Sequence, residues 1–395
     1  MTDSRLQRQA LRRRLSWLSA IASATLLLIA CGGGVVVGSA GVGSGGTGAA
    51  LGPVTGFGSV FVNGVRFDDS SASIFIDDVK RQSKDLRLGM MVEIDSTFDP
   101  SLTTGIAKSI TTFSYAKGPI SSMSTNSFTV LGLTIAVTPG TAFEGVRDLA
   151  GLQVNNVVKV HGVPDGQGGL KATYIKLASD PDSDHVRLVG PVKNLDPNAH
   201  TFTLYGSKIK YRPETGFAGL ANDVLVRVKG TLASTAPITI AASTVRAVTV
   251  NSLSNQGEHV EVYGIVTDFA SLENFKVGGL TVNAAGAIQE IAPANGVLAN
   301  GVSVEVEGMV DNGVLLATKV TSQDDSKSVQ VELHGSVSGL NGSTFKLRNE
   351  IVHWDNNTAF TSPLSDTTLI NGENIKVIGE IVDGDVLATS ITLEN

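Results

Sequence analysis

Residues 302–318, VSVEVEGMVDNGVLLAT, decide the fold class of this chain. Val302, Val304 and Val306 alternate with polar residues, as in a β-strand with one buried and one solvated face. The turn sequence Asp311-Asn-Gly313 then leads into a second apolar run, LLAT, which reads as the return strand. The stretch therefore predicts a β-hairpin.

This hairpin recurs along the chain. The alanine of its second strand returns every 65 to 75 residues or so, at Ala107, Ala172, Ala242, Ala317 and Ala388. Its first strand ends in a glycine in four copies: Gly162, Gly230, Gly308 and Gly379. Ser96 stands in that place in the first copy. The sequence predicts five repeats: 53–116, which is degenerate, then 117–182, 183–252, 253–326 and 327–395.

Each repeat shows further strand signals and no convincing long amphipathic helix. A glycine-ended strand opens the repeat, and an apolar segment with one phenylalanine follows, at Phe128, Phe202, Phe275 and Phe345. Phenylalanines at matched positions are predicted core residues. Five or six short strands in about 70 residues cannot hide both faces of a flat sheet, so closure is favoured. We expect an all-β chain, a tandem array of about five small OB-like (oligonucleotide/oligosaccharide-binding-like) β-barrel domains.

The segment from Ser127 to Ile135 (SFTVLGLTI), the Thr-x-Phe of Thr141 to Phe143 and the repeated hairpin together resemble a domain of bacterial lipoproteins, domain of unknown function 5666. The resemblance covers nearly the whole chain after Pro53 and is strongest in the second, fourth and fifth repeats. It implies a secreted, tandem, β-rich architecture. It brings no catalytic residues with it.

The first 30 residues have the form of an export signal. Five arginines precede the apolar run from Leu15 to Ala30, as in a secretory signal peptide. The residues Leu28-Ile29-Ala30-Cys31 resemble the bacterial lipobox, which predicts cleavage before Cys31 and lipidation of this single cysteine. Three acyl chains would anchor the protein stably. The resemblance to sorted lipoproteins of two-membrane bacteria implies the outer membrane, because Gly32 and not aspartate follows the cysteine; an uncleaved anchor and an ordinary signal peptide are the alternatives.

Residues 31–52 are nearly all Gly, Ser, Ala, Val and Thr and are predicted to form a flexible tether. Residues 43–48 match the dinucleotide pattern G-x-G-x-x-G, but Pro53 and strand-like sequence follow where a helix is required. A nucleotide site is therefore not expected. The formal net charge of −7 becomes more negative without the arginine-rich leader, which argues against a nucleic-acid partner.

The sequence predicts no catalytic residues, metal ligands or cofactor. Its six histidines lack metal-ligand spacing, and His161 and His334 are expected on the solvent face of strands. The segment from Asp180 to Asp184 begins like a calcium loop but lacks the required glycine and glutamate, and so reads as a linker. Trp354, the only tryptophan after the leader, is expected to pack in the core in preference to stacking on a ligand.

These observations favour a non-enzymatic envelope protein that binds or organises another envelope protein, with the membrane as a partner through Cys31. The alternative is a module for glycan or another small polar ligand, since OB-like barrels bind such molecules on one face. A less favoured third class is an enzyme with a site between repeats. That class requires a cleft in which carboxylates or histidines of adjacent repeats converge.

Overall fold

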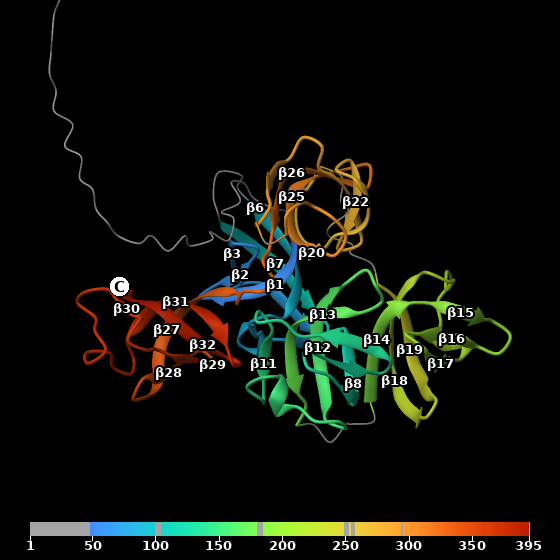
Figure 1. The fold of residues 1–395 in the computed structure, drawn as a ribbon, viewed down its shortest axis with the longest axis horizontal. Coiled ribbons are helices and arrows are strands. Elements are labelled where there is room, and N and C mark those ends of the chain that lie inside the picture. Colours follow the sequence, from blue (N-terminus) through green and yellow to red (C-terminus); the bar gives the residue numbers. More distant parts are fainter. Residues whose placement is uncertain are drawn as a thin grey trace, which may run out of the picture. The chain divides into compact units, whose positions relative to one another are not determined.

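The computed structural model describes residues 48–98, 104–179, 185–248, 253, 257–293 and 295–394, and strands dominate them (Figure 1). These residues belong to one compact unit of the chain. The predicted signal peptide, the lipobox with Cys31, and residues 31–47 of the tether lie outside the described residues.

The strands fall into five sets, which we number as repeats 1 to 5. Repeat 1 has β1 Ala49–Phe57, β2 Val60–Val62, β3 Val65–Asp68, β4 Ser73–Ile76, β5 Val79–Arg81, β6 Met91–Phe98 and β7 Thr104–Thr112. Repeat 2 has β8 Ala116–Met123, β9 Ser127–Val130, β10 Leu133–Ala136, β11 Ala142–Glu144, β12 Val157–Pro164 and β13 Leu170–Leu177. Repeat 3 has β14 His185–Pro191, β15 Lys193–Asp196, β16 Thr201–Leu204, β17 Ser207–Lys210, β18 Leu225–Thr235 and β19 Ile238–Ala247.

Repeat 4 has β20 His259–Ile265, β21 Thr267–Ser271, β22 Asn274–Val277, β23 Leu280–Asn283, β24 Ile288–Glu290, β25 Ser303–Asp311 and β26 Val314–Ser322. Repeat 5 has β27 Gln330–Asn341, β28 Thr344–Leu347, β29 Glu350–His353, β30 Ala359–Phe360, β31 Asn374–Val382 and β32 Asp385–Leu393. The described residues also form the short 3₁₀ helices η1 Ser83–Asp85, η2 Leu149–Gly151 and η3 Pro213–Thr215. Among the described residues no helix has the length and apolarity to span a bilayer.

Strand pairing in repeat 2 returns to its starting strand. β8 pairs antiparallel with β9, and β9 with β10. β10 runs parallel to β13, which pairs antiparallel with β12, and β12 pairs antiparallel with β8. Repeats 1 and 5 follow the same order. In repeats 3 and 4 the opening strand is split in two, into β14 and β15 and into β20 and β21.

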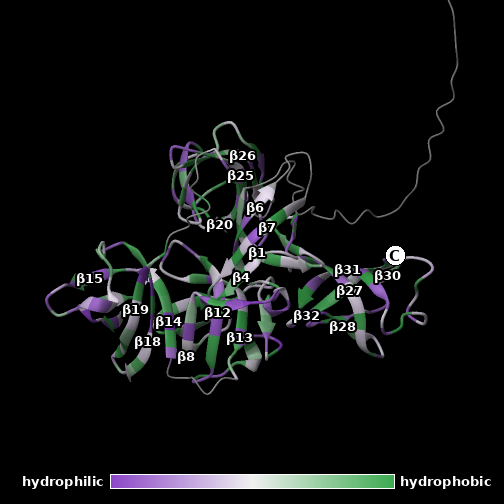
Figure 2. Cartoon of the chain, turned by 180° about the vertical axis from the view of Figure 1, so that it is seen from behind, coloured by the Kyte–Doolittle hydropathy of each residue, from purple (hydrophilic) through white to green (hydrophobic). Residues whose placement is uncertain are grey.

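Because polar and apolar residues alternate in the sequence, every second side chain of a strand points into the interior of its repeat. Burial alternates along β25 and β31, and hydrophobic and hydrophilic residues alternate along strands such as β12 and β18 (Figure 2). The predicted core phenylalanines are confirmed, because Phe128, Phe202, Phe275 and Phe345 are at most 1% exposed. Burying each of these rings contributes about 2 to 3 kcal/mol relative to leaving it in water.

The repeated hairpin glycine sits at a bulge where the two strands approach closely. In repeat 4 the register shifts between Glu307 and Gly308. A Cβ atom on Gly308 would lie 2.2 Å from the carbonyl oxygen of Leu316, and Gly162, Gly230 and Gly379 face the same obstacle. The short distance between the two backbones therefore favours glycine at this position in repeats 2 to 5. Ser96 occupies the equivalent bulge in repeat 1, where the register also shifts.

Replacing Gly308 with alanine should destabilise the protein by about 1–3 kcal/mol, because the new methyl group must push the facing strand away. The change in stability is compared with that of Ser96→Gly, a variant that removes a side chain from the equivalent bulge in repeat 1. Thermal unfolding followed by circular dichroism measures both. An unchanged melting temperature for Gly308→Ala would contradict the proposed reason for the motif.

Strand pairing also continues between repeats, so the repeats do not form five separate sheets. β1 pairs parallel with β20 and with β27, and β8 pairs antiparallel with β14. The strands consequently join into one sheet of 20 strands, from repeats 1, 4 and 5, and one of 12 strands, from repeats 2 and 3. The all-β class and the repetition were predicted. The pairing between repeats was not, because it uses backbone groups and leaves no side-chain pattern.

The predicted tether also ends earlier than expected, because β1 begins at Ala49 and not after residue 52. Ala49 and Ala50 are fully buried. Ala50 lies opposite Ile94 of β6 on one side and Glu261 of β20 on the other. Small residues suit a strand that is paired along both edges and covered, and the same small residues resembled a low-complexity linker in the sequence.

Candidate functional site

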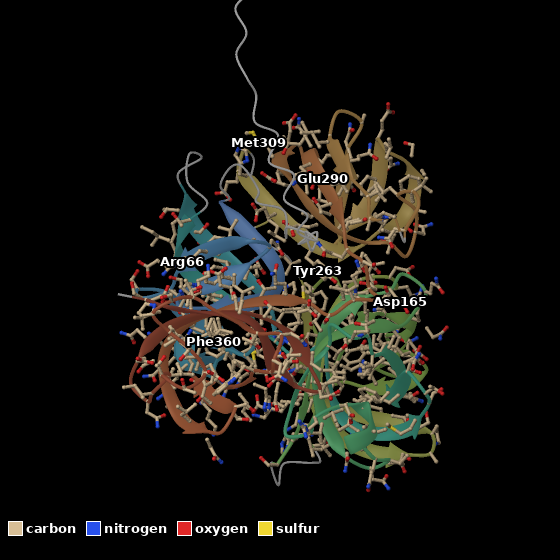
Figure 3. The ribbon with its side chains drawn as sticks, turned by 60° about the vertical axis from the view of Figure 1, so that its left-hand side comes forward. Arg66, Asp165, Tyr263, Glu290, Met309 and Phe360 are labelled. Atoms are coloured by element: carbon tan, nitrogen blue, oxygen red, sulfur yellow. The ribbon has the colours of Figure 1, made fainter. Side chains whose placement is uncertain are left out.

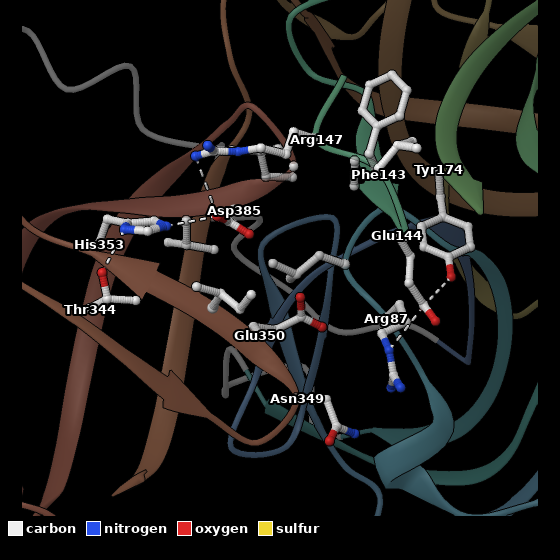
Figure 4. Close-up of a pocket in the computed structure, with 18 residues that line it drawn as sticks. Arg87, Phe143, Glu144, Arg147, Tyr174, Thr344, Asn349, Glu350, His353 and Asp385 are labelled. Atoms are coloured by element: carbon white, nitrogen blue, oxygen red, sulfur yellow. Dashed lines mark hydrogen bonds and ion pairs between the residues drawn. The ribbon is translucent and has the colours of Figure 1, made fainter. Parts of the chain in front are cut away.

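Residues of three repeats line a cavity of about 540 Å³ (Figure 4). Repeat 1 contributes Arg87 and Leu88, which follow η1. Repeat 2 contributes residues 142–147 and Tyr174, from β11, the loop after it, and β13. Repeat 5 contributes residues of β28, β29 and the hairpin from β31 to β32. The volume lies within the range of about 300–1,000 Å³ that is usual for small-molecule sites.

Glu144 is held in the cavity by three donors. The Tyr174 hydroxyl donates to Oε2 at 2.5 Å, Lys176 Nζ donates to Oε1 at 2.6 Å, and Arg87 Nε lies 3.2 Å from Oε2. Burial raises the pKa of Glu144, but the hydrogen bonds from Lys176 and Tyr174 outweigh it and hold the pKa below its usual value. Glu144 is thus an ionised carboxylate whose oxygens are both engaged.

A second polar group lies in the part of the cavity built from repeat 5. His353 Nε2 is 2.7 Å from Asp385 Oδ2, and its Nδ1 is 2.9 Å from the Thr344 hydroxyl, which lies opposite on β28. Arg147 Nη2 from repeat 2 is 3.9 Å from the same Asp385 oxygen. Contacts at both ring nitrogens fix the orientation of the imidazole.

Glu350, the first residue of β29, is the unusual group of the cavity. Its Oε1 is buried and has no hydrogen-bond partner. Burial raises the pKa of Glu350 to about 7, against the opposing effects of Arg87 and of a backbone hydrogen bond from Leu88. Figure 4 shows its carboxyl group in the cavity near Arg87 and Asn349. Burial thus favours the protonated form of this carboxyl group, and one of its oxygens lacks a hydrogen-bond partner.

Charged groups outside the cavity link repeats 1 and 3. Asp77 and Asp78 form the turn between β4 and β5, both with positive φ. Asp77 binds Arg187 of β14 and accepts a hydrogen bond from the Ser114 backbone at 2.9 Å. Asp78 accepts from Arg227 Nη2 at 2.7 Å and from Lys229 Nζ at 2.5 Å, which lowers its pKa to about 2 even though burial acts in the opposite direction. These contacts fasten the hairpin of repeat 1 to repeat 3.

A buried amine links repeats 2 and 4 in the same way. Lys171 Nζ of β13 lies 2.8 Å from the Tyr263 hydroxyl, 2.5 Å from the Ser303 hydroxyl and 2.8 Å from Asp325 Oδ1. Tyr263 is labelled in Figure 3. The Lys171 side chain is only 9% exposed, so its charge depends on these partners.

Repeat 4 also buries carboxyl groups. Glu261 is fully buried, and neither of its carboxyl oxygens has a hydrogen-bond partner. Burial and the nearby Glu305 and Glu307 raise its pKa well above the usual value. Burial also raises the pKa of Glu305 to about 8. Lys319 forms an ion pair at 3.0 Å with Glu290, which Figure 3 labels.

The prediction of solvent-exposed His161 and His334 was wrong. His161 is 3% exposed, and its Nδ1 lies 3.2 Å from the Thr112 hydroxyl of repeat 1. Burial lowers its pKa to about 4. His334 lies 2.8 Å from Glu332 and 2.6 Å from Glu394, and its ring stacks on Phe61 of repeat 1. Both histidines do point away from their own core, but a neighbouring repeat covers that face.

The other predicted sites have different outcomes. Cys31 and the lipobox residues Leu28, Ile29 and Ala30 lie outside the described part of the chain. Trp354 packs against Phe345 and Phe360, as expected for a structural residue. Within the described ranges, no three His, Cys, Asp or Glu side chains are grouped so that they could hold a metal ion. No sequence pattern predicted the cavity, because Arg87, Glu144 and Glu350 lie in segments that share no motif.

The fold and these contacts define an all-β protein built from tandem strand repeats. Residues 117–176, 263–321 and 334–392 match the family DUF5666, a domain of unknown function. The three matching segments lie in repeats 2, 4 and 5, where the sequence resemblance is strongest. No curated protein matches the chain. A solved structure titled "drosophila Unr CSD456" is 17% identical over 47% of this chain and 84% of its own, with a TM-score of 0.16.

Proposed function

We propose that this protein is a lipid-anchored envelope protein, without catalytic activity, that binds a small polar ligand in the cavity between repeats 1, 2 and 5. Each repeat is proposed to be an OB-like barrel. The pairing order of repeat 2, which runs β8-β9-β10-β13-β12 and back to β8 with one parallel step, supports this.

The observation that carries the proposal is the unpartnered Oε1 of Glu350 in a cavity of ligand size. A buried polar atom without a partner costs about 1–3 kcal/mol, and a ligand that supplies a hydrogen bond recovers this energy. The cavity combines apolar walls from Leu88, Ile381 and Val386 with several fixed polar groups. This combination is typical of sites for sugar-sized molecules.

Isothermal titration with a panel of soluble glycan fragments and small polar metabolites should identify a ligand. Removing the Glu350 carboxyl group with Glu350→Ala should weaken its binding by about 10- to 100-fold, the effect of losing a hydrogen bond to a charged group. Glu273→Gln, which changes an exposed carboxylate in the turn between β21 and β22, is the matched control. A panel without any binder would contradict the proposal. So would a ligand whose affinity is equal in the wild type and in Glu350→Ala.

The proposed anchor has its own test. The mature protein should begin at Cys31, and its N-terminal peptide should carry acyl chains in a mass spectrum of the outer-membrane fraction. Cys31→Ala should release the protein from the membrane without changing its fold. A membrane-bound, unlipidated product with the leader retained would contradict the anchor. An envelope protein captured by the wild type and equally by Glu350→Ala would favour the scaffold function over ligand binding.

A further inference from the structure

We infer that the ligand of this cavity carries a protonated amine that binds Glu350, and that binding releases a proton from the Glu350 carboxyl group. This inference rests on the proposed function and specifies its ligand class. An amino sugar is a molecule of the required size and chemistry.

The charge pairing of the cavity supports an amine. Three carboxylates line its described part: Glu144, Glu350 and Asp385. Glu144 already binds Lys176 and Arg87, and Asp385 already contacts His353 and Arg147. Among the residues that the structure describes, Glu350 makes no ion pair, and its Oε1 makes no hydrogen bond. The acceptor left for a ligand is therefore a carboxyl oxygen that has neither a hydrogen bond nor an ion pair.

A hydroxyl group and an ammonium group would satisfy this oxygen differently. A hydroxyl brings no charge, so the buried carboxyl group can remain protonated when a neutral sugar binds. An ammonium brings a positive charge into the same low-dielectric space, where a protonated carboxyl group cannot compensate it and a carboxylate can. Binding an amine therefore favours the ionised form of Glu350, and the displaced proton leaves to the solvent.

This coupling fixes the pH dependence. Burial raises the pKa of Glu350 to about 7, so the free protein holds this proton at pH 6. The affinity for an amine should rise by about tenfold per pH unit below pH 7, level off above it, and fall again once the amine itself loses its proton. The ionisable groups that contribute to the pKa of Glu350 from the surrounding elements are Arg87, Glu144 and Arg348. Arg87 and Arg348 remain charged throughout this range.

The test compares a glucosamine disaccharide that has free amines with its N-acetylated form, by calorimetry at pH 6 in two buffers of different ionisation enthalpy. The free amine should bind at least tenfold more tightly, with about one proton released per ligand. Glu350→Gln, a neutral isostere of the protonated acid, should abolish both the preference and the proton release. Glu273→Gln should retain both. The melting temperature of each variant verifies folding.

The outcomes separate this inference from the proposed function. Equal binding of the two disaccharides without proton release would contradict the inference of an amine ligand. It would remain consistent with a ligand site in the cavity. An amine preference that persists in Glu350→Gln would also overturn it. If neither disaccharide nor any molecule of the wider panel binds the wild type, the proposed function itself fails.

Discussion

Replacing Arg187 with methionine should lower the free energy of unfolding by about 3 kcal/mol, the lower end of the range for a buried ion pair, because it leaves the partly buried carboxylate of Asp77 without its cation. Arg187 is 8% exposed and binds both Asp77 and the Ser114 hydroxyl, the latter at 2.6 Å. Burial raises the pKa of Asp77, but Arg187 and the Ser114 backbone together lower it below the usual value, so Asp77 is ionised in the fold. Denaturant unfolding measures the loss.

Two further variants identify the cause. Arg246→Met removes an exposed arginine on β19 and should change stability by less than about 0.5 kcal/mol. Asp77→Asn combined with Arg187→Met removes both charges and should recover part of the loss. A loss no greater for Arg187→Met than for Arg246→Met would show that the ion pair does not hold repeats 1 and 3 together.

The sequence predicted those features that depend on a single repeat. Alternating valines predicted strands, the hairpin glycines recurred because each marks a bulge, and the matched phenylalanines lie in the cores. These signals are local, since each arises from side chains that face the interior of one repeat.

The sequence did not predict that one repeat buries the outer face of another. Polar residues at outward strand positions read as solvated, although Glu261 and His161 are buried there. The cavity depends on the same effect. Glu350 follows the turn between β28 and β29 of repeat 5, and residues of repeats 1 and 2 enclose the space around it. Such contacts follow from how the repeats assemble, and no period within the sequence encodes them.

The second large effect is a dependence of stability on pH, which arises from His161. Burial lowers its pKa from 6.5 to about 4, with Arg187 and Lys159 acting in the same direction and Asp77 opposing them. The folded state therefore holds a neutral imidazole, while the unfolded chain takes up a proton below pH 6.5. His161 therefore does not reduce the free energy of unfolding above pH 6.5. Below pH 6.5 it reduces this free energy progressively as the pH decreases toward 4. The shift corresponds to a loss of about 3 kcal/mol at pH 4 and below.

Other groups titrate over the same pH range. The contribution of His161 is therefore the difference in stability loss between the wild type and His161→Gln. His334 has the opposite sign, since its hydrogen bond to Glu332 raises its pKa and stabilises the fold at low pH. Denaturant unfolding at pH 7, 5.5 and 4 should therefore show His161→Gln losing less stability on acidification than the wild type. His200→Gln, a histidine that contacts Tyr211 in repeat 3, should follow the wild type. Parallel losses in all three proteins would mean that the pKa of His161 is not lowered in the folded state, and would contradict the prediction.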